Sequence, residues 1–191
     1  MIKLIKNKNN YLSYIEKEIS ATSSLPELNR YYSEFIKRYR ELDSLYKFTE
    51  YFDEEFVYAQ LAEQYHKINR PLFALPFGIK DIFNTKVLPT TMGSEVWSGF
   101  TAGNNARVVD EIVDSGGILF SKTTTAEFAV HFITPRKTLN PYNKDHITGT
   151  SSAGSAVAVS CGALPIALGT QTAGSIIRPA SFCGVNGFKP S

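Results

Sequence analysis

Residues 105–120 read Asn-Ala-Arg-Val-Val-Asp-Glu-Ile-Val-Asp-Ser-Gly-Gly-Ile-Leu-Phe, and this stretch indicates an α/β fold. Its first part predicts a helix over 105–115, because aliphatic residues fall on one side at helical spacing and two glycines follow Ser115. Those aliphatic residues are Val108, Val109, Ile112 and Val113. The apolar run 118–120 comes directly after the glycines and is short, as expected of a buried strand. A helix that returns at once into a buried strand is typical of α/β domains.

The segments on either side continue this pattern. Residues 74–83, Ala-Leu-Pro-Phe-Gly-Ile-Lys-Asp-Ile-Phe, predict a strand that carries one lysine, Lys80, in a largely apolar run. After a polar loop at 137–150, residues 153–162 predict a helix of small residues and 164–168 a further strand.

The N-terminal part is helical instead. Ser24 and Glu27 have capping-box spacing, and a stripe of apolar residues then repeats at steps of three and four. The stripe consists of Leu28, Tyr32, Phe35, Tyr39, Leu42 and Tyr46. Asp53 caps a second predicted helix over 54–68. We therefore expect a helical segment over residues 1–70 that packs on a core formed by residues 71–191.

Composition restricts the function classes. The 191 residues are 43% apolar and 13% aromatic, which is enough for one globular core. Twenty basic residues against eighteen acidic ones give a net charge of +2, too balanced to predict binding to nucleic acid or to a membrane surface. There is no signal-peptide pattern and no run of about 20 apolar residues. We expect a cytoplasmic protein whose two cysteines, Cys161 and Cys183, are buried thiols.

Two Ser/Gly-rich segments, 149–155 and 169–175, are flanked by apolar residues and predict loops that expose main-chain N–H groups. Such loops suit an anion or a developing oxyanion. A nucleotide site is disfavoured, because neither segment ends in Gly-Lys-Ser/Thr and no Gly-x-Gly-x-x-Gly is present.

A serine nucleophile in these loops needs a base. His66 and His131 are better explained as a helix-surface and a partly buried structural residue, and His146 is undecided. Lys80 is the stronger candidate, since burial lowers the pKa of a lysine. A fall of the Lys80 pKa to about 7 requires that its charged form be destabilised by roughly 4–5 kcal/mol. A dry site can supply this if Asp81 points to the opposite face of the strand.

Several blocks resemble the amidase signature family. They are Pro76-Phe-Gly-Ile-Lys-Asp81, Thr90-Thr-Met-Gly-Ser94, Lys122-Thr-Thr-Thr-Ala-Glu-Phe-Ala129, Thr134-Pro-Arg136 with Asn140-Pro141, Gly149 to Val159, and Ala167 to Pro190. The resemblance covers 71–190 and leaves residues 1 to about 52 outside. It implies an α/β fold with a mixed central sheet flanked by helices, of which this chain is the N-terminal, incomplete part.

The resemblance also implies a Ser-cisSer-Lys triad. Ser175 would be the nucleophile, Ser151 the bridging serine after a cis peptide bond, and Lys80 the base. The oxyanion hole would consist of main-chain N–H groups from Thr172, Ala173, Gly174 and Ser175. No cofactor or metal is implied.

Three features depart from the family pattern. Thr150 replaces a common glycine, Gln171 replaces a commoner aspartate with Arg178 shifted by one position, and the family's domain is more than twice as long. We therefore expect an amidase that hydrolyses a small-molecule carboxylic amide, with little activity in the chain alone. Direct contact with nucleic acid is not expected, and a homodimer of the full-length protein stays open. The alternatives are a glutaminase-like A subunit of a tRNA-dependent amidotransferase, and an inactive fragment that acts as an interaction piece.

Overall fold

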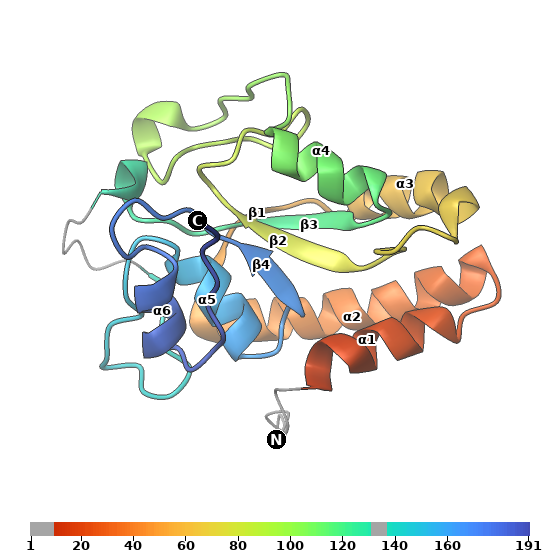
Figure 1. The fold of residues 1–191 in the computed structure, drawn as a ribbon, viewed down its shortest axis with the longest axis horizontal. Coiled ribbons are helices and arrows are strands. Elements are labelled where there is room, and N and C mark those ends of the chain that lie inside the picture. Colours follow the sequence, from red (N-terminus) through yellow and green to blue (C-terminus); the bar gives the residue numbers. More distant parts are fainter. Residues whose placement is uncertain (1–9, 131–136) are drawn as a thin grey trace.

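A computed structural model describes residues 10–130 and 137–191 (Figure 1). The helices are α1 (Tyr11–Ser20), α2 (Leu25–Tyr46), α3 (Glu54–Gln64), α4 (Arg107–Asp114), α5 (Ala153–Ser160) and α6 (Ile177–Phe182). The strands are β1 (Thr49–Phe52), β2 (Pro76–Lys80), β3 (Ile118–Thr123) and β4 (Ile166–Leu168). This is an α/β fold, as the sequence predicts.

The sheet is mixed and has the strand order β1-β3-β2-β4. β2 is parallel to both of its neighbours, β3 and β4, whereas β1 is antiparallel to β3. Every residue of β2 and of β3 is buried. A polar side chain on these two strands therefore has to find its partners inside the protein.

Helices cover both faces of the sheet (Figure 1). One face, with Ile118 and Phe120, packs against α1, α2 and α5. The other face, with Phe77, Ile79 and Leu119, packs against α4 and the loop that follows β2. The alternation of side chains along a strand thus gives β2 and β3 two separate apolar environments.

The long helix α2 forms as its sequence predicts. Ser24 Oγ accepts the Glu27 N–H at 3.4 Å, and Glu27 Oε2 accepts the Ser23 N–H at 2.8 Å. Five of the six residues in the predicted stripe are buried, and Tyr46 is partly buried. The Tyr39 and Phe120 rings lie 4.8 Å apart, so this helix packs directly on β3.

Other boundaries differ from the predictions. Helices α1 and α6 and strand β1 are not among the predicted elements, although Tyr11, Ile15 and Ile19 of α1 are buried and repeat at helical spacing. β1 places a part of residues 1–70 within the sheet. The strand predicted over 74–83 is shorter, because Ala74 has a positive φ of 53° and Asp81 leaves the strand to pair with another side chain. The predicted helix over 54–68 ends at Gln64 and continues as a 3-10 turn at Tyr65–Lys67.

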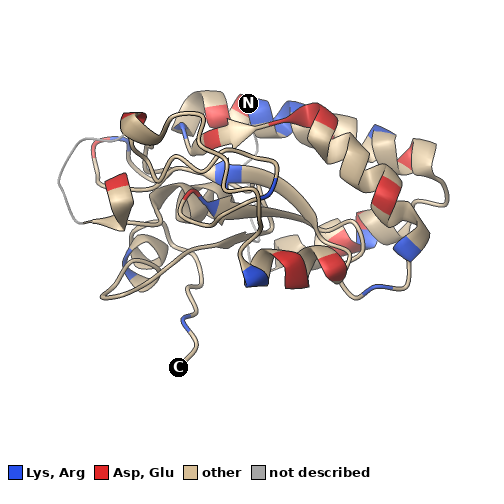
Figure 2. Ribbon diagram, turned by 90° about the horizontal axis from the view of Figure 1, so that it is seen from above, with Lys and Arg blue, Asp and Glu red and all other residues tan. Residues whose placement is uncertain are grey.

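The surface and the two cysteines agree with the composition. Figure 2 shows acidic and basic residues interspersed along the helices. Cys161 and Cys183 are both buried thiols. Within residues 10–130 and 137–191, no helix has the length and apolarity needed to cross a bilayer.

Candidate active site

Lys80 is the last residue of β2, and its side chain is fully buried. Its Nζ donates hydrogen bonds to Ser151 Oγ at 2.6 Å and to Thr170 Oγ1 at 2.7 Å, and lies 3.5 Å from Thr170 O. Burial lowers the pKa of Lys80 from 10.5 to about 8. The lysine predicted from sequence thus lies in a dry site among neutral oxygen atoms.

Ser151 is held by the start of α5. The Thr150–Ser151 peptide bond is cis, and Gly149 before it has a positive φ of 73°. Ser151 is fully buried, and its main-chain oxygen accepts the Ala126 N–H at 3.2 Å. At Gly154 in the first turn of α5, a Cβ would lie only 2.6 Å from Phe48 O. A glycine here lets the helix approach the neighbouring chain segments and keeps Ser151 next to the end of β2.

Ser175 lies on the loop before α6 and is 7% exposed. Its main-chain oxygen accepts the Ser152 N–H at 3.2 Å, which brings it beside the residue after Ser151. No hydrogen bond joins the Ser151 and Ser175 hydroxyls among the described residues. The structure thus brings Lys80 and Ser151 into direct contact and attaches Ser175 to them through the main chain.

The N–H groups of residues 172–175 have no hydrogen-bond acceptor within the part of the chain that the structure describes. Thr172 and Ala173 are exposed. The next two N–H groups, of Ile176 and Ile177, are bonded to Gln171 Oε1 at 2.8 and 2.9 Å. Arg178 belongs to α6, and its N–H donates to Gly174 O at 2.8 Å.

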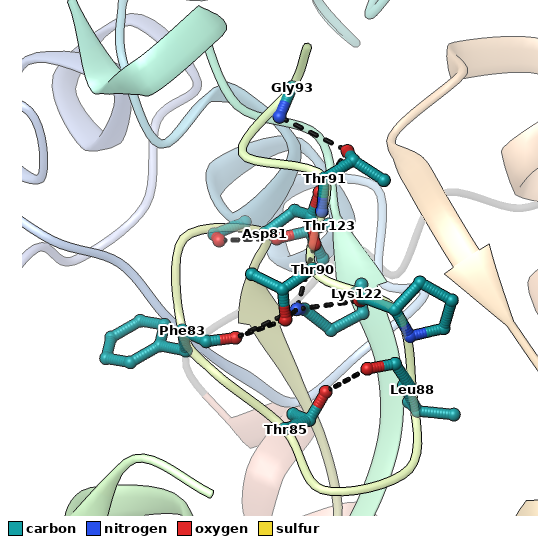
Figure 3. A network of polar contacts seen from close by, with 11 residues as sticks. Asp81, Phe83, Thr85, Leu88, Thr90, Thr91, Gly93, Lys122 and Thr123 are labelled. Atoms are coloured by element: carbon teal, nitrogen blue, oxygen red, sulfur yellow. Dashed lines mark hydrogen bonds and ion pairs between the residues drawn. The ribbon is translucent and has the colours of Figure 1, made fainter. Parts of the chain in front are cut away.

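A second buried lysine, Lys122 on β3, belongs to the network of polar contacts in Figure 3. It pairs in register with Ile79 and not with Lys80, so it lies on the opposite face of the sheet. Lys122 Nζ forms an ion pair with Asp81 Oδ1 at 2.8 Å, and both side chains are fully buried. The same Nζ donates to Thr90 Oγ1, Phe83 O and Pro89 O at 2.7, 2.8 and 3.0 Å. Burial lowers the pKa of Lys122 and the charge of Asp81 opposes this shift, so the pair favours an ammonium.

Two residues of this region were not predicted. Lys122 lies beyond the strand predicted over 118–120, but β3 extends to Thr123 and includes it. A longer strand prediction would have given Lys122 the signal that identified Lys80, a lysine within a buried strand. Thr170 carries no local signal, because its contact with Lys80 spans 90 positions of the sequence. His66 and His146 are exposed, and His131 is outside the described residues. No group of three or more His, Cys, Asp or Glu side chains suited to a metal occurs in the described ranges.

Comparison with known protein families gives one assignment. The family model described as Amidase matches residues 30–191. The chain belongs to the amidase signature family. The match begins well before residue 52, so the expectation that residues 1 to about 52 fall outside the family is wrong for residues 30–52. The matched residues include most of α2, the helix that packs on the sheet.

The curated relatives of this amidase-family chain include glutamyl-tRNA(Gln) amidotransferase A subunits. The subunit of Chloroflexus aggregans is 42% identical over 125 residues, which cover 63% of this chain and 26% of the relative. That of Methanococcoides burtonii is 34% identical over 184 residues, or 94% of this chain and 38% of the relative. The chain therefore spans at most about two fifths of these relatives.

Solved structures of the family have the same fold over nearly the whole chain. The peptide amidase PAM in complex with the competitive inhibitor chymostatin has a TM-score of 0.81 and 26% identity, covering 94% of this chain and 39% of that one. A protein complex linked to the origin of an s-triazine catabolic enzyme has a TM-score of 0.79 and 28% identity, covering 91% and 40%. This chain thus corresponds to a partial amidase signature fold.

Proposed function

We propose that the protein carrying this chain hydrolyses a carboxylic amide through an acyl-enzyme on Ser175, with Ser151 as proton relay and Lys80 as base. The observation that carries the proposal is the 2.6 Å contact between the buried Lys80 Nζ and Ser151 Oγ. A lysine whose pKa is about 8 is partly neutral near neutral pH and can accept a proton, whereas an ordinary lysine is already protonated there.

The surroundings of the two buried lysines support this assignment. Lys122 pairs with a carboxylate and has three hydrogen-bond acceptors for its three protons, so it is suited to remain charged. The side-chain partners of Lys80 are only two hydroxyls. Groups of one kind whose environments differ in this way commonly divide between structural and chemical roles.

The proposed reaction begins with neutral Lys80. Ser175 Oγ attacks the amide carbon while its proton passes to Ser151 Oγ, and the Ser151 proton passes to Lys80 Nζ. The carbonyl oxygen becomes an oxyanion, for which the N–H groups of 172–175 are available donors. Reversal of the relay protonates the leaving amine as the C–N bond breaks, and water then hydrolyses the ester on Ser175.

Labelling with a fluorophosphonate tests the proposal. The whole natural polypeptide that carries residues 1–191 should be labelled at Ser175, and the Ser175→Ala variant should not be labelled. Lys80→Ala and Ser151→Ala should slow labelling by at least about 100-fold, the lower range for loss of a general base. Undiminished labelling of Ser175→Ala, or a label mapped to another serine, would contradict the assignment.

The chain of 191 residues should itself be a poor amidase, because its relatives are more than twice as long. Within the described part of the chain, strand β4 pairs only with β2 and leaves its other edge open, and Ile166 on it is 41% exposed. Residues that cover this edge would also help to keep water from Lys80. A comparison of 1–191 with a full-length relative in the same labelling assay should give much slower labelling of the short chain, and equal rates would contradict this expectation.

A second candidate is the glutaminase part of a tRNA-dependent amidotransferase, in which the amide is glutamine and the ammonia passes to a partner. The names of the curated relatives favour it. Purification of the natural polypeptide from its host distinguishes the two candidates. Associated subunits and a glutamine-dependent activity are expected for the amidotransferase, whereas hydrolysis of simple amides without a partner is expected for the amidase.

A further inference from the structure

Gln171 occupies the position at which the family pattern commonly has aspartate. Its Oε1 accepts two main-chain hydrogen bonds, from the N–H of Ile176 at 2.8 Å and of Ile177 at 2.9 Å. These are the two residues that follow Ser175. The Gln171 side chain and the backbone from 171 to 177 thus form a hydrogen-bonded ring, which we call the 171–177 ring. Ser175 is one of the residues of this ring.

The 171–177 ring is attached to the base at its other end. Thr170, the residue before Gln171, accepts a hydrogen bond from Lys80 Nζ at 2.7 Å. Its N–H and its main-chain oxygen are each bonded to Ser152 Oγ at 3.3 Å. Residues 170–175 therefore connect Thr170, which accepts a hydrogen bond from Lys80, to Ser175. The side chain of Gln171 closes the 171–177 ring within this segment.

The ring also separates the main-chain N–H groups of this segment into two sets, those bonded to Gln171 and those without an acceptor. Gln171 takes those of 176 and 177, while those of 172–175 have no acceptor among the described residues. A loop whose four N–H donors have no acceptor is flexible unless another contact fixes its ends. Donors aimed at a developing charge are effective only when they are fixed in advance. The side chain of Gln171 supplies that contact without adding a charge.

We propose that Gln171 is a positioning residue, whose side-chain oxygen holds the 171–177 ring closed so that Ser175 and the N–H groups of 172–175 meet the substrate carbonyl in a fixed geometry. This inference rests on the proposed function of Ser175. It assigns no contact between Gln171 and the substrate.

The test compares two variants in the whole natural polypeptide. Gln171→Leu keeps the size but removes the acceptor, whereas Gln171→Glu keeps an oxygen at the same place. Amide hydrogen exchange at Ile176 and Ile177 measures the ring, and the rate of fluorophosphonate labelling at Ser175, together with kcat and KM, measures the positioning.

We expect Gln171→Leu to speed exchange at both amides and to lower kcat and the labelling rate at least about 10-fold, with KM changed less than about twofold, since misplacement by even an ångström slows a reaction strongly. Gln171→Glu should keep slow exchange and stay within about threefold of the parent in labelling.

Three outcomes would overturn the inference. They are unchanged exchange in Gln171→Leu, unchanged labelling in Gln171→Leu despite faster exchange, and equal loss of labelling in both variants. If the parent protein is not labelled at Ser175, the proposed function fails and the positioning role fails with it. The exchange data still report in that case whether the ring exists, so the two failures are distinguishable.

Discussion

Asp81 directly follows Lys80 in the sequence, yet its carboxylate pairs with Lys122 at 2.8 Å on the other face of the sheet (Figure 3). In the parallel pair of β2 and β3, Lys122 lies beside Ile79 and Thr123 beside Lys80, so strand alternation places Lys122 on the face opposite to Lys80. Asp81 follows the last residue of β2, where the chain turns, and its carboxylate reaches that face. Lys122 and Thr91 account for both oxygens of the carboxylate. The Asp81 charge is thereby kept away from the hydroxyls that surround Lys80.

The Asp81–Lys122 pair should stabilise the fold strongly. Lys122→Met leaves a buried carboxylate without its cation and should lower the free energy of unfolding by about 3–5 kcal/mol. Asp81→Asn combined with Lys122→Met removes both charges and should recover a large part of this loss. Urea unfolding of the whole polypeptide measures the effect. Lys86→Met, at an exposed lysine of the same loop, is the control and should change stability by less than about 0.5 kcal/mol. An equal loss in the single and double variants would show that the charge is not the cause.

Labelling of Ser175 should depend on the protonation of Lys80. Burial lowers the pKa of this lysine to about 8, and only the neutral amine can accept a proton. The rate should therefore rise with pH through about 8, and at pH 7 it should be about one tenth of its plateau value. A series of labelling rates from pH 6 to 10 measures this directly. A rate that falls with rising pH, or one that is flat across this range, would contradict the role of Lys80.

Thr170 should tune that pH profile. Its hydroxyl accepts a hydrogen bond from Lys80 Nζ, and such a bond is stronger when the donor is charged. Thr170→Val removes the acceptor, destabilises the ammonium and should shift the rise in rate to lower pH by up to about one unit. Thr170→Ser keeps the hydroxyl and should keep the parental profile. A shift to higher pH in Thr170→Val, or the same shift in Thr170→Ser, would contradict this role.

The sequence predicts local features better than contacts between distant segments. The capping box at Ser24, the buried stripe of α2 and the opposite directions of Lys80 and Asp81 all follow from helical or strand periodicity, and the structure contains them. β1 is a four-residue edge strand with half-exposed residues, so its identity depends on pairing with β3. The contact of Thr170 with Lys80 depends on the whole sheet, because β4 has to align with β2 before the two residues meet. Such non-local pairing leaves no periodic mark in the sequence.

Gly154 should be required for the approach of α5 to the sheet. A Cβ at this position would lie 2.6 Å from Phe48 O, a main-chain atom that cannot move aside without disturbing the segment before β1. Gly154→Ala should therefore lower the free energy of unfolding by about 1–3 kcal/mol through overpacking, although alanine is the better helix former.

Gly99→Ala is a control that changes backbone conformation without a steric clash, whereas Gly154→Ala introduces a clash. Gly99 has a positive φ of 77° and open space around it, so Gly99→Ala should cost only about 1 kcal/mol of backbone strain. Because α5 begins two residues after Ser151, Gly154→Ala should also slow labelling at Ser175, whereas Gly99→Ala should leave it unchanged. Urea unfolding and labelling of the same preparations measure both effects. A Gly154→Ala variant as stable and as reactive as the parent would show that α5 has room to move without displacing Ser151.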